Sequence, residues 1–158
     1  MVTPLLVARW AHLYSDNKAV SDAVTFVHLT GILLGGGVAI AADRASIQLA
    51  LQSYAPFVPP LGGHAVHRWV LIGLGLITAS GLLMLLADLH TYVTSVLFWI
   101  KMGLTLGLVG NGYVRLRAER AVIAGMQAAR RRFRSTSLVS FVLWLVILLA
   151  GTMLVSSD

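Results

Sequence analysis

The chain is organised around four hydrophobic stretches separated by short polar segments. They cover residues 24–42, 69–87, 93–114 and 138–155. Each is long enough, as a helix rising about 1.5 Å per residue, to cross a hydrocarbon layer about 30 Å thick. A backbone in lipid must satisfy its own polar groups, which a helix does within one segment. We therefore expect an all-α integral membrane protein, a four-helix up-down bundle.

The composition leaves no room for a separate soluble domain. Of the 158 residues, 58% are apolar and only 11% are charged, and nearly all lie in or beside the four stretches. We expect residues 1–158 to form a single transmembrane domain in contact with the lipid bilayer. The absence of cysteine excludes disulfides, thiolate-held iron–sulfur clusters and the covalent attachment of a c-type haem.

The basic residues are sorted between the two sides of the expected membrane. Residues 43–68 and 115–135 are rich in arginine, whereas the other side carries only Arg9 and Lys18. The arginines of the first group are Arg44, Arg68, Arg115, Arg117, Arg120, Arg130, Arg131, Arg132 and Arg134. Basic loops stay cytoplasmic, so both termini are expected to be periplasmic, in a bacterial inner membrane. The net charge of +6 is a topology signal here, and we expect no nucleic-acid partner.

The segments outside the four stretches give more local predictions. Residues 3–15 mix aromatic, apolar and basic groups over a length too short to span, which favours a retained interfacial helix at the outer surface. Ser21 and Asp22 are a natural cap for the first span. Residues 44–52 are expected to extend the first helix into the cytoplasm. Helix propensity predicts that the third helix continues through residues 114–134 and turns back at Ser135.

His28 begins the most suggestive face of the first stretch. Gly31, Gly35, Ala39 and Ala42 follow it at helical spacing. Small residues let a second helix or a flat cofactor approach the backbone closely. Two interpretations of His28 stay open: a neutral histidine bonded to a carbonyl or hydroxyl, or a ligand of a haem b or a (bacterio)chlorophyll.

Other candidate ligands are scattered. His90 lies in the expected outer turn, at residues 88–92, and is a candidate second cofactor-binding residue. His64 and His67 form a weak metal motif at the cytoplasmic mouth of the second stretch. Met84, with His28, gives copper as a less favoured alternative, because thioether and imidazole groups suit Cu(I).

Lys101 is a cation within the third stretch, one to two turns below the outer surface. It is a further cofactor-binding candidate, and the other interpretations are snorkelling or pairing with Asp22 or Asp88. Three glycines, Gly103, Gly107 and Gly110, lie on the opposite face, which we expect to pack tightly. The fourth helix is expected to pack through a stripe of Ser137, Ser140, Trp144, Ile147 and Gly151. No carboxylate lies well inside any of the four stretches.

The chain resembles the CopD-like, cytochrome-b-like group of small bacterial membrane proteins. The matching segments are Val27–Gly31 with Leu34–Gly37, His67–Trp69 with Thr78–Gly81, and Phe98–Met102 running to Asn111. The resemblance implies an inner-membrane helical bundle with haem or copper, and it highlights His28 and Lys101. The chain lacks a histidine near Val114 and Arg115, where relatives often have one.

No paired acids, nucleophile–base set or phosphate-binding loop stands out, so we expect no catalytic site. The favoured function is a non-catalytic subunit packed among other membrane protein subunits, in a respiratory or photosynthetic electron-transport complex. The alternatives are a haem- or pigment-binding electron-transfer protein that uses His28 and, second, a copper-handling membrane protein.

Overall fold

The computed structural model describes residues 3–51 and 63–156, and no strand occurs among them. The prediction of an all-α chain is confirmed. The helices in chain order are α1 (Thr3–Asp16), α2 (Lys18–Gly31), the π-helical segment η1 (Ile32–Gly37), α3 (Val38–Leu51), α4 (Gly63–Ala87), α5 (Leu89–Thr94), α6 (Val96–Ile123) and α7 (Gln127–Ser156).

Helices α2, η1 and α3 form one continuous helix that ends at Leu51, as expected from the predicted extension of the first helix over residues 44–52, of which Gln52 lies outside the described residues. The start of this helix was predicted wrongly. Asn17 caps it, with an extended backbone and a side chain that accepts from the Ala19 amide at 3.1 Å. Ser21 and Asp22 lie inside the first turns, because Asn17 already satisfies a free amide and breaks the helical backbone before them.

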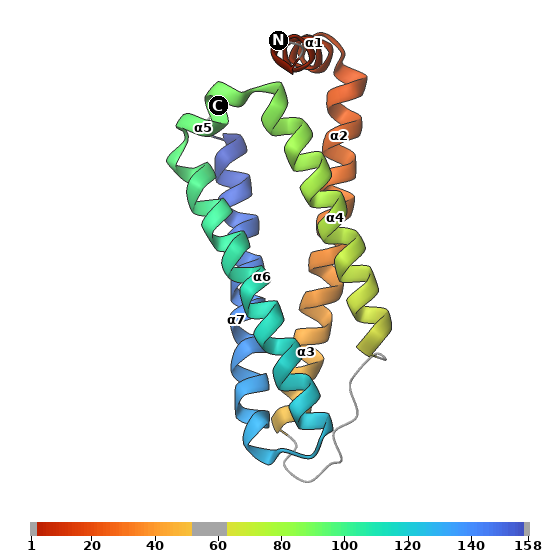
Figure 1. Ribbon diagram of the computed structural model, residues 1–158, viewed down its shortest axis with the longest axis vertical. Coiled ribbons are helices and arrows are strands. Elements are labelled where there is room, and N and C mark those ends of the chain that lie inside the picture. The colour runs from red at the N-terminus through yellow and green to blue at the C-terminus, as the bar shows by residue number, and fades with distance from the viewer. Residues whose placement is uncertain (1–2, 52–62, 157–158) are drawn as a thin grey trace.

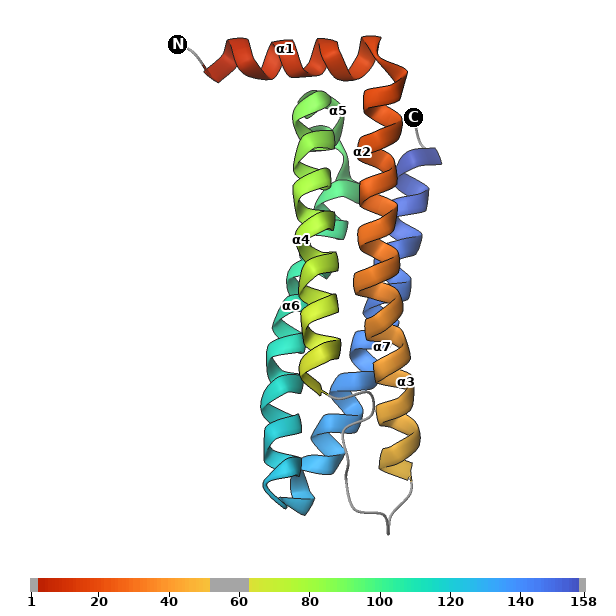
Figure 2. The ribbon, with the colours of Figure 1, turned by 90° about the vertical axis from the view of Figure 1, so that its right-hand side faces the viewer.

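Helix α1 lies across the ends of the long helices, almost perpendicular to them (Figure 2). The predicted short helix over residues 3–15 is therefore present. The indole Nε1 of Trp10 donates to the carbonyl oxygen of Leu83 at 2.8 Å, which ties α1 to the upper part of α4. An aromatic residue with a polar edge suits this position between an apolar helix side and a helix end.

The opposite end of the molecule is a hairpin of α6 and α7 (Figure 1). The predicted turn at Ser135 is wrong: α6 ends at Ile123, and α7 begins at Gln127. Gly125 has a φ of 84°, a left-handed conformation that glycine adopts without steric cost, and it reverses the chain there. Arg130, Arg131, Arg132 and Arg134 consequently lie in the first turns of α7, whereas Arg115, Arg117 and Arg120 lie in α6. Phe133 packs on Ala118 and Val122 in a small core within this hairpin.

The long helices pack in sequence, each on the next. Helix α4 packs on α2 and η1, α3 packs on α7, and α7 packs on α6 along most of its length. Helices α4 and α6 have no comparable interface, although they neighbour each other in the chain. On α7, Ser137, Ser140 and Trp144 are buried, which confirms the predicted packing stripe of that helix.

Three helical segments are long and apolar enough to cross a membrane: Lys18–Gln48, Val66–Ala87 and Ala128–Leu154. Only 28%, 11% and 28% of their most apolar windows are buried inside the molecule. Apolar surface on this scale is stable only beside lipid or another apolar partner, which indicates a multi-pass membrane protein. Helix α6 is not among the three segments. It carries Lys101, Asn111 and Arg115 within its length.

Candidate functional site

His28 is half-buried between α2 and α4. Its Nδ1 lies 2.9 Å from the hydroxyl oxygen of Ser80, so the two side chains are hydrogen-bonded. The ring lies against α4, since a Cβ placed on Gly81 would be 3.6 Å from the His28 Cε1. Of the two interpretations of this histidine, the structure shows the bond to a hydroxyl.

The small-residue face beside His28 is filled by the backbone of α4. A Cβ on Gly31 would lie 3.0 Å from the carbonyl oxygen of Gly73, and one on Gly35 would lie 3.3 Å from the Gly73 Cα. The two helices meet backbone to backbone, which only glycines at the crossing allow. A flat macrocycle such as a haem or a chlorophyll does not fit on this face.

The other candidate ligands are not brought together. His90 is exposed on α5, His67 is half-buried in the first turns of α4, and Met84 lies near the other end of α4, about 25 Å further along the helix. His64 begins α4, but its side chain lies outside the described residues. Within residues 3–51 and 63–156, no group of three or more histidines and acidic residues could hold a metal ion.

Lys101 points toward the other helices and not toward lipid. A Cβ on Gly151 of α7 would lie 3.5 Å from its Nζ. The ammonium group is also close enough to His28 to interact with it electrostatically. The predicted pairing with Asp22 or Asp88 is wrong for the described residues. Asp22 instead forms an exposed ion pair with Lys18 at 3.3 Å.

The glycines on the far side of α6 contact nothing. A Cβ on Gly103, Gly107 or Gly110 would find no described atom within 4 Å. We call these three residues the α6 glycine face. Its position opposite Lys101 was predicted, but the tight packing expected there does not occur within the described part of the chain.

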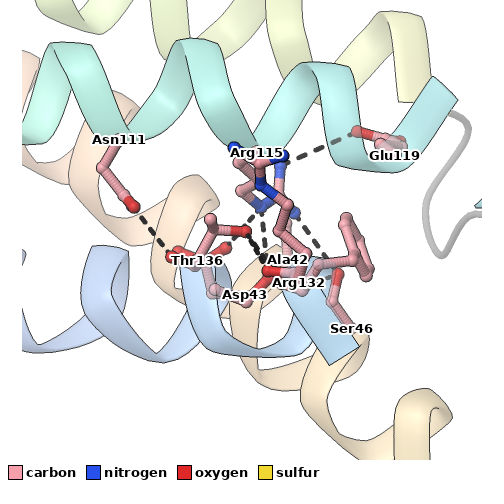
Figure 3. A network of polar contacts seen from close by, with 10 residues as sticks. Ala42, Asp43, Ser46, Asn111, Arg115, Glu119, Arg132 and Thr136 are labelled. Atoms are coloured by element: carbon pink, nitrogen blue, oxygen red, sulfur yellow. Dashed lines mark hydrogen bonds and ion pairs between the residues drawn. The ribbon is translucent and has the colours of Figure 1, made fainter. Parts of the chain in front are cut away.

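The most extensively bonded polar site was not predicted. Asp43 on α3 is 2% exposed, and its Oδ1 forms an ion pair with Nε of Arg115 on α6 at 2.8 Å (Figure 3). The same Nε lies 3.3 Å from the hydroxyl of Ser137 on α7, and Nη2 donates to the hydroxyl of Ser46 at 3.3 Å. Three helices are joined through one guanidinium group.

Further contacts hold Arg115 in place. Glu119 lies 3.9 Å away, one turn along α6, and the ring of Phe133 lies 5.3 Å from the guanidinium carbon. One turn above, the Asn111 amide donates to the carbonyl oxygen of Thr136 at 2.8 Å (Figure 3). A guanidinium with partners at each of its three nitrogens is positioned for structure, because its charge is already directed at protein groups.

The second carboxylate oxygen of Asp43, Oδ2, is buried and makes no hydrogen bond to a described residue. Ser137 and Ser140 lie close enough to the carboxylate to act on it electrostatically. A buried oxygen of this kind is a place for an ordered water molecule bridging to a serine hydroxyl. The site can therefore hold α3, α6 and α7 in register.

Sequence reasoning missed this pair because Asp43 directly follows the first stretch and Arg115 directly follows the third. Both were interpreted as loop charges. A signal was present in the spacing: Asn111 and Arg115 on one helix, and Ser137 and Ser140 on another, share a face at intervals of three or four residues. Polar groups aligned in this way at the ends of apolar stretches indicate a polar layer inside the protein.

No family model matches the chain, no curated protein matches it, and no solved structure matches it. The resemblance to CopD-like proteins stays a prediction.

Proposed function

We propose that the chain is a non-catalytic, membrane-spanning subunit that packs against a helix of another protein in a larger membrane complex. It sits as a four-helix up-down bundle in a bacterial inner membrane, with α1 on the periplasmic surface and the α6–α7 hairpin in the cytoplasm. The expected setting is electron transport. The observation that carries the docking role is the α6 glycine face.

Glycine inside a helix costs about 0.5–1 kcal/mol relative to alanine. Three glycines on one helix face at a spacing of four and three residues therefore need a compensating contact. Another glycine face in the same chain has a helix packed on it. Gly31 and Gly35 receive the α4 backbone at Gly73 in direct contact. The α6 glycine face has the same pattern and no occupant among the described residues, which supports a helix of a second protein as its partner.

The surroundings of the α6 glycine face suit an apolar helix. Ile100, Leu106 and Tyr113 are exposed beside it, with Leu106 exposed by 74%. The packing side of α6, with Leu108, Ala118 and Val122 buried, is turned toward α7. A partner helix can therefore dock on α6 without disturbing the contacts within the chain.

The proposed orientation rests on charge. Helix α1 and the end of α7 lie at one end of the molecule, and the α6–α7 hairpin lies at the other (Figure 1). Six arginines follow Arg115 on that hairpin: Arg117, Arg120, Arg130, Arg131, Arg132 and Arg134. Basic residues beside spanning helices are retained on the cytoplasmic side, which supports this orientation. No comparable observation favours the alternatives built on His28.

The Gly107→Leu variant tests the docking role. A leucine in the middle of the α6 glycine face should keep a partner helix at a distance and reduce co-purification from native membranes in mild detergent by about tenfold or more. The matched control is Gly75→Leu, since Gly75 is also exposed on its helix with no atom within 4 Å of its Cβ position. The measurement is quantitative mass spectrometry of the material that co-purifies with each tagged variant. Equal recovery of membrane partners with both variants would contradict the proposal.

A further inference from the structure

Lys101 is a half-buried cation without a counter-ion among the described residues. Its Nζ makes neither a hydrogen bond nor an ion pair there, and Asp22 is engaged by Lys18. Arg115, another half-buried cation, has a different environment. Arg115 has a carboxylate at 2.8 Å and hydroxyl groups around it. Because an ammonium group removed from water costs several kcal/mol unless it is paired, the contrast indicates that a group outside the chain completes the Lys101 site.

The Lys101 side chain does not extend along α6 toward the end of the molecule, as a snorkelling lysine would. Lys101 lies about 7.5 Å along α6 from its first residue, and Gly151, which Nζ approaches, lies about 7.5 Å before the end of α7. The side chain therefore crosses sideways from one helix to the next. The Lys101 terminus packs beside Gly151, since a Cβ at that position would be in ordinary van der Waals contact with Nζ at 3.5 Å.

His28 is the nearest titratable group known to act on Lys101, and its ring is already hydrogen-bonded within the chain. His28 interacts electrostatically with Lys101, and its Nδ1 is occupied by Ser80 at 2.9 Å. The Ser80 hydroxyl donates to the Leu76 carbonyl oxygen, so Nδ1 is the donor in the contact of His28 with Ser80, and Nε2 is left as an acceptor that does not bind an oxyanion. Lys101 lies near the start of α6 and His28 near the end of α2, two helices that are distant in the sequence.

We propose that Lys101 binds the oxyanion headgroup of a membrane lipid, either the carboxylate of a fatty acid or the phosphate of a phospholipid. The ammonium group supplies the charge and the N–H donors for the headgroup oxygens. The acyl chain runs along the apolar surfaces of α4 and α6. These helices share no comparable interface, so a chain can enter beside them without separating packed helices. The site does not depend on the α6 glycine face.

Thermal unfolding of the purified chain in a neutral detergent tests the site. Palmitate and lysophosphatidylglycerol are the anionic probes, and hexadecanol and monopalmitoylglycerol are their uncharged counterparts. At a hundredfold excess over Kd, an anionic probe is expected to raise Tm by about 5 °C or more. The neutral probes should leave Tm unchanged. A response to palmitate alone identifies a fatty acid, and a response to the lysophospholipid alone identifies a lipid phosphate.

Two variants locate the response. Lys101→Met keeps the length of the side chain and removes its charge, so it should abolish the shift in Tm. The control is Lys18→Met, which removes a cation exposed at the start of α2. Equal shifts in Lys101→Met and wild type, or equal shifts with charged and neutral probes, would overturn the proposal. The comparison of charged with neutral probes uses the wild-type chain and holds even where a substitution prevents folding.

Discussion

Replacement of Asp43 by alanine is expected to lower the free energy of unfolding by about 3–5 kcal/mol. The substitution removes the closest carboxylate of the Arg115 guanidinium inside the helix packing. Glu119, at 3.9 Å, is too far away to replace that hydrogen-bonded pair, and Ser46 and Ser137 cannot neutralise the charge. The loss should appear as a lower midpoint of guanidinium-induced unfolding in detergent, followed by tryptophan fluorescence. Trp144 is a useful reporter because it is buried on α7, one of the three helices that the pair joins.

Two further variants test whether the loss of stability comes from the Asp43–Arg115 ion pair or from the removal of any charge in this part of the chain. Arg44→Ala removes the neighbouring charge, which is exposed, and should change the stability by no more than about 0.5 kcal/mol. The double variant Asp43→Ala/Arg115→Met should be more stable than Asp43→Ala alone, since it no longer buries an uncompensated charge. A double variant as unstable as the sum of the two single variants would show that the ion pair carries no coupling energy.

The second large effect is expected for Gly73→Ala, although it adds a single methyl group. A Cβ on Gly73 would collide with the backbone nitrogen and Cα of Gly35 and would lie 2.8 Å from the Gly31 carbonyl oxygen. Backbone atoms inside two helices cannot move aside as a flexible side chain does, so α2 and α4 must separate. We expect a loss of about 3 kcal/mol in the free energy of unfolding, or no folded protein.

The matched control lies two residues away on the same helix. Gly75 is exposed, and a Cβ there meets no atom within 4 Å, so Gly75→Ala should leave the stability unchanged or raise it by about 0.5–1 kcal/mol. Unfolding in detergent, measured as for Asp43→Ala, compares the two variants. If Gly73→Ala and Gly75→Ala unfold at the same denaturant concentration, the close contact between α2 and α4 does not exist in the protein.

The glycines at the contact between α2 and α4 were not equally recognisable in the sequence. The face of Gly31 and Gly35 was visible as small residues at helical spacing, and the structure places it inside, against α4. Gly73 was not singled out, because Gly73 and Gly75 look alike in an apolar run. Only the crossing point of α4 on η1 distinguishes them. The α6 glycine face shows the same limit: its spacing resembles that of Gly31 and Gly35, yet no residue in the described part of the chain covers it.

Local chemistry accounts for what the sequence by itself determined. Apolar runs, helix propensity and the arrangement of charges predicted helices, the extension of the first helix, the helix over residues 3–15 and the buried stripe of α7. Each depends on residues within a few turns of one another. The prediction also failed locally where two signals competed. Asn17 ended α1 before Ser21 could act as a cap, and Gly125 turned the chain before Ser135.

Tertiary structure alone decided which polar groups meet. Asp43 and Arg115 are 72 positions apart in the sequence, and their contact depends on how far α3 and α6 slide along α7. The same relative position of helices brings Lys101 to Gly151 and pairs it with no carboxylate of residues 3–51 and 63–156. Helical spacing determines the face on which a residue lies. The partner across that face depends on the offset and crossing of helices distant in the chain, which no local pattern of residues encodes.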